Sequence, residues 1–101
     1  MFRVHLRGGT SPTLVLVGDV DLAAAPELRR ALRSVAAESA MTVDLTAVTF
    51  IDSVGVGLLL GGARRSRDAG GELTVRVTDG RIHATLIAFG VDRLVPLVLS
   101  G

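Results

Sequence analysis

Two kinds of apolar pattern follow one another along this chain, and their succession constrains the fold more than any other feature. Phe2, Val4 and Leu6 alternate with polar residues, as in a half-buried strand. Leu28 and Leu32 instead recur at the spacing of one face of a helix. Both patterns recur within 101 residues, which is the usual size of one domain. The sequence therefore predicts a single small α/β domain over residues 1–101, with a mixed, mostly parallel sheet and helices packed on it.

Glycine and proline residues separate the expected elements. Pro26 suits the first turn of a helix, where its missing N–H is not needed. Pro96 cannot donate to a strand ladder, so the last strand should lie at an edge of the sheet. Phe50 and Ile51 are expected as a separate apolar pair leading into the second helix. The expected strands cover residues 2–6, 13–17, 41–45, 73–77 and 94–99, and the expected helices cover residues 26–35, 53–69 and 82–89, with the first two strands forming a hairpin.

Composition excludes several classes of protein. The chain has no cysteine, which removes disulfides and thiolate metal sites. Its longest apolar stretch, residues 54–63, is too short for a membrane span, which needs about 20 residues. The first residues lack the apolar run of a signal peptide, so we expect a soluble, cytoplasmic domain without membrane insertion.

Direct binding to nucleic acid is not expected either. The net charge is only +1, and aromatic residues make up 3% of the chain, which disfavours a surface that stacks on bases. Arg64, Arg65 and Arg67 form a basic cluster. This cluster is either a solvated last helical turn or part of a nucleic-acid patch, and the absence of a wider basic face favours the first.

No catalytic constellation emerges from the remaining polar residues. His5 and His83 have no neighbouring ligands at metal spacing. Ser53 and Gly55 resemble half of a nucleophile elbow, but Ile51 stands where the first glycine belongs. We expect no enzyme activity, no cofactor and no metal.

Asp19 and Asp21 allow two interpretations. Both carboxylates point the same way if the chain is extended, as in a metal-binding pair. Alternatively they belong to a strand-to-helix turn, in which aspartate bonds nearby backbone, and the lack of a third acidic residue close by favours the turn.

The start of the second helix is the most informative segment. Asp52 and Ser53 are capping residues immediately before an apolar run. Gly55 and Gly57 cost about 1 kcal/mol each in a helix relative to alanine, which indicates close backbone approach to the sheet or to a partner. Ser53 is either a helix cap or an exposed hydroxyl, and we expect a side chain at residue 55 to project toward a docked partner.

Here the sequence resembles the STAS domains, specifically the bacterial anti-sigma-factor antagonists. The family signature runs aspartate-leucine-x-x-(apolar)-x-phenylalanine-(apolar)-aspartate-serine-x-glycine-(apolar)-glycine. Four segments match motifs of the family, in the family's order, over residues 18–94: Gly18-Asp19-Val20-Asp21-Leu22-Ala23-Ala24-Ala25-Pro26-Glu27-Leu28, Asp44-Leu45-Thr46-Ala47-Val48-Thr49-Phe50-Ile51-Asp52-Ser53-Val54-Gly55-Val56-Gly57-Leu58, Ala69-Gly70-Gly71-Glu72-Leu73, and Phe89-Gly90-Val91-Asp92-Arg93-Leu94.

The resemblance implies a partner switch without catalysis or a cofactor. The partner would be an anti-sigma factor with serine kinase activity. The unmodified domain would bind this kinase and release a sigma factor, and phosphorylation of Ser53 would end the binding. The domain itself would be a monomer or weak dimer. The implied partner-binding residues are Asp21, Asp52, Ser53, Val54, Gly55 and Val56. The alternative is a STAS subunit that scaffolds a transporter or a larger signalling assembly, with Ser53 unmodified.

Overall fold

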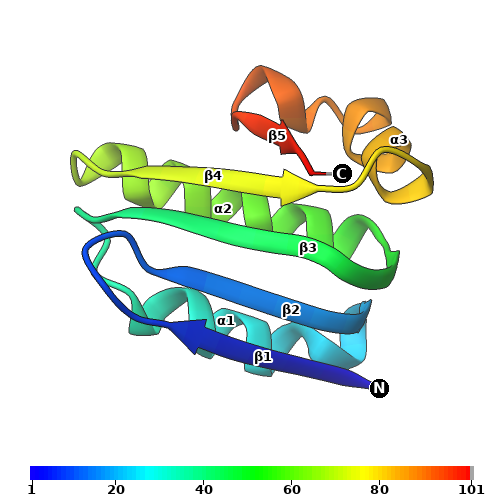
Figure 1. Ribbon diagram of the computed structural model, residues 1–101, viewed down its shortest axis with the longest axis horizontal. Coiled ribbons are helices and arrows are strands. Elements are labelled where there is room, and N and C mark those ends of the chain that lie inside the picture. The colour runs from blue at the N-terminus through cyan, green and yellow to red at the C-terminus, as the bar shows by residue number, and fades with distance from the viewer. Residues whose placement is uncertain (101) are drawn as a thin grey trace.

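A computed structural model of the protein describes residues 1–100 and contains one five-stranded sheet, with its strands in chain order (Figure 1). The first two strands pair antiparallel, and every later pair is parallel. The predicted hairpin and the mixed, mostly parallel sheet are therefore confirmed. The elements are β1 (Phe2–Arg7), β2 (Thr13–Val20), η1 (Leu22–Ala24), α1 (Ala25–Ser34), β3 (Ala40–Ile51), α2 (Ser53–Asp68), β4 (Glu72–Val77), α3 (Arg81–Ala88), η2 (Val91–Arg93) and β5 (Leu97–Leu99).

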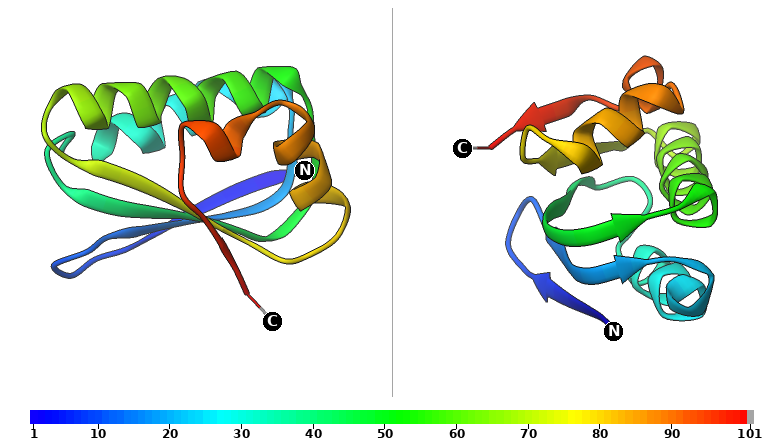
Figure 2. Two further views of the ribbon diagram at one scale, coloured as in Figure 1. Left: turned by 90° about the horizontal axis from the view of Figure 1, so that it is seen from above. Right: turned by 90° about the vertical axis from the view of Figure 1, so that its right-hand side faces the viewer.

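Helices α1 and α2 cover the same face of the sheet (Figure 2). Each connects two neighbouring parallel strands, and such crossovers are right-handed, which places consecutive ones on one side. Leu28 of α1 and Leu59 of α2 are fully buried against Val43 and Val75 of the sheet. The core therefore lies between the helices and one face of the sheet, and no helix covers the other face within residues 1–100.

Strand β3 is longer than the sequence predicts. The expected strand at 41–45 and the separate apolar pair at 50–51 are one strand of 12 residues. Its pairing with β2 shifts register at two points, as at β-bulges. The Asp44 carboxylate accepts bonds from the backbone N–H (2.8 Å) and the hydroxyl (2.7 Å) of Thr46. This local hydrogen bonding holds the irregular stretch, so the broken alternation in the sequence does not end the strand.

The final strand is shorter than expected and lies at the edge of the sheet. It begins at Leu97, after Pro96, and pairs only with β4. Residues 91–93, just before it, form the 3-10 turn η2. The edge position agrees with the absence of a donor on Pro96.

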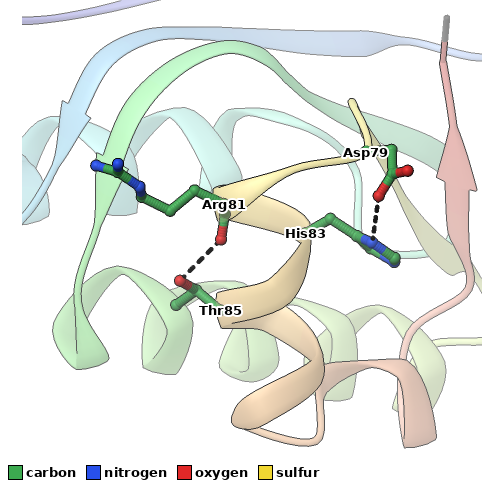
Figure 3. Close-up of polar contacts among 4 residues, drawn as sticks. All are labelled: Asp79, Arg81, His83 and Thr85. Atoms are coloured by element: carbon green, nitrogen blue, oxygen red, sulfur yellow. Dashed lines mark hydrogen bonds and ion pairs between the residues drawn. The ribbon is translucent and has the colours of Figure 1, made fainter.

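The two histidines lie apart, on β1 and on α3. His83 faces Asp79 across 3.6 Å between Nδ1 and Oδ1, and the Thr85 hydroxyl donates to the Arg81 carbonyl at 3.0 Å (Figure 3). The first contact joins α3 to the loop before it, and the second lies within the helix. Among residues 1–100, no three His, Asp or Glu side chains are grouped so that they could hold a metal ion. None of the described helices is both long and apolar enough to cross a membrane.

Candidate functional site

The carboxyl ends of β2 and β3 bring together two of the predicted site residues. Val20 pairs with Ile51 in the parallel register, and each is followed directly by an aspartate. Asp21 and Asp52 therefore leave the sheet side by side. In open α/β sheets, ligands commonly bind outside the carboxyl ends of the strands.

Asp52, and not Ser53, caps α2. Its Oδ1 atom accepts hydrogen bonds from the backbone N–H groups of Val54 (3.0 Å) and Gly55 (3.1 Å). Ser53 is the first residue of the helix, and its side chain is exposed. The Ser53 hydroxyl makes no hydrogen bond to any residue from 1 to 100. The sequence left open whether Ser53 caps the helix or presents an exposed hydroxyl. The structure shows an exposed hydroxyl that does not cap the helix.

Gly55 and Val56 face the core, which corrects two of the predicted partner-binding residues. A Cβ atom on Gly55 would stand 2.6 Å from the Val20 carbonyl oxygen and 2.7 Å from Val20 Cγ1. Val56 is only 2% exposed. The prediction that a side chain at residue 55 would project toward a partner is wrong, because this turn of α2 packs directly on β2. Their neighbour Val54 is half-exposed.

The two aspartates at the end of β2 have different roles. Asp21 accepts a hydrogen bond from the backbone N–H of Ala24 at 3.2 Å and so caps the short turn η1. Asp19 accepts from the Thr49 hydroxyl at 2.8 Å, which links β2 to β3. Both line a shallow recess of about 230 Å³. The turn interpretation is therefore correct for Asp21, whereas Asp19 lies within β2 and its carboxylate bonds a side chain of β3.

Two large apolar side chains close to Asp21 and Asp52 in the sequence are exposed, and the sequence analysis did not predict their exposure. Leu22, next to Asp21, is 71% exposed, and Phe50, two residues before Asp52, is 50% exposed. The signal for Phe50 was available, since neighbours in a strand face opposite sides and Ile51 is buried. We call the exposed and half-exposed residues at this end of the sheet the Ser53 edge: Asp21, Leu22, Phe50, Asp52, Ser53 and Val54. An edge of exposed apolar groups among charges is typical of a protein-binding surface.

Comparison with known proteins agrees with the fold and the motifs. No curated protein sequence matches the chain. It is similar to the structure of an anti-sigma factor antagonist from Mycobacterium paratuberculosis, with a TM-score of 0.89 and 24% identity over 99% of this chain and 87% of that one. It is also similar to the anti-sigma factor antagonist SpoIIAA in its unphosphorylated form, with a TM-score of 0.68 and 20% identity over 100% of this chain and 89% of that one. The family model described as "Mlab, STAS domain" matches residues 6–98. The chain therefore belongs to the STAS domain family.

Proposed function

We propose that this protein is a cytoplasmic anti-sigma-factor antagonist that works without catalysis of its own. Through the Ser53 edge it binds an anti-sigma factor with serine kinase activity, and the bound sigma factor is released. Phosphorylation of Ser53 ends the binding. The observation that carries the proposal is the state of Ser53, which is exposed and not hydrogen-bonded within residues 1–100, at a helix start that Asp52 caps instead.

A phosphate on Ser53 would act on the partner more than on the fold. Two N–H groups of the first turn already donate to Asp52, so they are not free to stabilise a phosphate. Because Ser53 is exposed, the added charge of about −1.5 to −2 would remain solvated in the free protein. A kinase that modifies Ser53 must hold the phosphates of its nucleotide against this hydroxyl. A phosphoserine would face those phosphates, and such a clash of like charges costs several kcal/mol.

The experiment begins with capture of the partner by the unmodified protein, followed by its purification. With ATP, the partner should phosphorylate the wild-type protein, and mass spectrometry should place the phosphate on Ser53. Ser53→Ala should bind as the wild type does but accept no phosphate. Ser53→Asp should bind about ten-fold more weakly or worse. Phosphate on another residue, or equal affinity of all three forms, would refute the switch.

A second candidate function rests on the family match. The matching model carries the description Mlab and not anti-sigma-factor antagonist. In this alternative, the Ser53 edge is a constant docking surface for a transporter or a larger signalling assembly. The captured partner would then be a subunit of that assembly, and Ser53→Asp would weaken binding without any phosphate being found on the natural protein.

A further inference from the structure

A groove of about 200 Å³ lies between α1 and α2, and most of the residues that line it are exposed. Gly57 and Gly61 of α2 form part of its wall, and Leu58 supplies an apolar surface. At the closed side, a Cβ atom added to Gly62 would stand 3.5 Å from the Leu32 side chain. The two helices therefore touch at Gly62 and separate along Gly57 and Gly61.

The backbone of α2 is bare along this groove. A Cβ atom on Gly57 or on Gly61 would meet nothing within 4 Å. Packing within the domain therefore does not require glycine at either position, although each weakens the helix by about 1 kcal/mol relative to alanine. The two glycines are spaced by four residues, on the same side of the helix. They leave room for another chain to approach the backbone of α2 closely.

The groove also carries strong positive charge. Arg29 and Arg33 of α1 and Arg65 of α2 line it, and all three are exposed. The Arg65 guanidinium donates to the Leu32 carbonyl at 2.8 Å, which holds it across the two helices. None of these arginines pairs with a carboxylate within residues 1–100. Asp68 and Arg64 lie beyond the groove, in an adjoining recess that shares Gly61 and Arg65.

We propose that this groove binds an acidic amphipathic helix of the partner protein. The proposal rests on the function proposed above, since it assigns the chemistry of a second contact with that partner. The groove between α1 and α2 suits a third helix, because the side chains of one helix pack into the grooves of others. The apolar side chains of such a helix would lie over Leu58 and the two bare glycines. Carboxylates on its flanks would meet Arg29, Arg33 and Arg65, and guanidinium groups bind carboxylates in a two-pronged geometry.

The groove and the Ser53 edge are continuous along α2. Ser53 lies one helical turn before Gly57, because the two are four residues apart. The edge carries the carboxylates of Asp21 and Asp52, whereas the groove carries arginines. A partner that covers both surfaces therefore needs basic groups opposite the Ser53 edge and acidic groups opposite the groove. This order of charges sets the orientation of the partner on the domain.

The test uses a synthetic amphipathic peptide of 16 residues, the length of α2, with leucines on one face and glutamates on its flanks. It is titrated into the full-length ¹⁵N-labelled protein, and the backbone amide signals of Gly57 and Gly61 are followed by NMR. We expect saturable shifts at both glycines. Arg33→Glu, and separately Gly57→Leu, should weaken the binding about ten-fold or more. The matched control is Arg30→Glu, which changes the charge of α1 equally at an exposed residue outside the groove and should stay within about two-fold of the wild type.

Several results would overturn the proposal. These are the absence of shifts at the two glycines, equal binding of a peptide with lysines in place of the glutamates, and equal loss of binding in Arg30→Glu. The last result would indicate a general attraction to anions, such as that of a membrane or a nucleic acid. Failure here and failure of the Ser53 switch are separate. A protein that ignores the peptide can still lose its partner on phosphorylation of Ser53, and a protein without phosphate on Ser53 can still bind the peptide.

Discussion

Glycines lie on both the inner side of α2, which packs on the sheet, and the outer side, which is exposed, but their roles on the two sides differ. On the inner side, Gly55 packs against the backbone of β2, and a Cβ atom there would overlap the Val20 carbonyl. On the outer side, Gly57 and Gly61 have open space around them. Ser53 begins the outer side with an exposed hydroxyl. The inner side therefore holds the fold together, whereas the outer side is free to bind.

The comparison shows what a helix-weakening glycine means in a sequence. The cost of glycine in a helix indicates that something approaches the backbone closely, but it does not say what. For Gly55 that neighbour belongs to the domain itself. For Gly57, a Cβ atom would meet nothing within 4 Å in residues 1–100, so we infer that the close neighbour belongs to a partner. Substitutions on the two sides should separate stability from binding.

The largest effect on stability is expected from Gly55→Ala. The new methyl group would need to displace the Val20 carbonyl, which is backbone and cannot rotate away. Overpacking of this kind lowers the free energy of unfolding by about 1–3 kcal/mol. Urea denaturation followed by circular dichroism measures it. An unchanged urea midpoint would mean that the packing between α2 and β2 has room for the methyl group.

Asp52→Ala should have a somewhat smaller effect. It removes the acceptor of the Val54 and Gly55 N–H groups, and loss of such a cap costs about 0.5–2 kcal/mol. Asp52→Asn keeps a capping oxygen and should restore most of the stability in the same denaturation experiment. If both variants are equally unstable, the charge of Asp52 matters and its capping does not.

Gly57→Ala should change stability in the opposite direction. The methyl group enters open space, and alanine favours the helix, so the free energy of unfolding should rise by up to about 1 kcal/mol. Thermal unfolding of this variant beside Gly55→Ala gives the contrast directly. A loss of stability in both would remove the distinction between the two sides of α2.

The fold could be predicted from the sequence because its periodic patterns are strong. The order of elements, the hairpin and the edge position of the last strand all follow from apolar spacing, glycine and proline. The continuity of β3 could not be predicted, since the interaction of Asp44 with Thr46 interrupts the alternation without ending the strand. A local pattern does not contain the pairing with β2 that keeps this stretch in the sheet.

The candidate site was predicted in part. Motif resemblance located Asp21, Asp52 and Ser53, and the structure places them at one end of the sheet. The motif resemblance could not decide whether Asp52 or Ser53 caps α2. It also could not identify the arginine-lined groove, because Arg33 and Arg65 are distant in sequence and meet only when α1 packs on α2.

The most direct test of the account compares the protein phosphorylated on Ser53 with the unmodified protein. Unfolding measurements give the stability of each form, and titration calorimetry gives its affinity for the purified partner captured by the unmodified protein. We expect the free energies of unfolding to agree within about 0.5 kcal/mol, since Ser53 is exposed and does not cap the helix. The affinity should fall about ten-fold or more on phosphorylation. Equal affinities, or a phosphorylated form that loses affinity because it unfolds, would contradict the account.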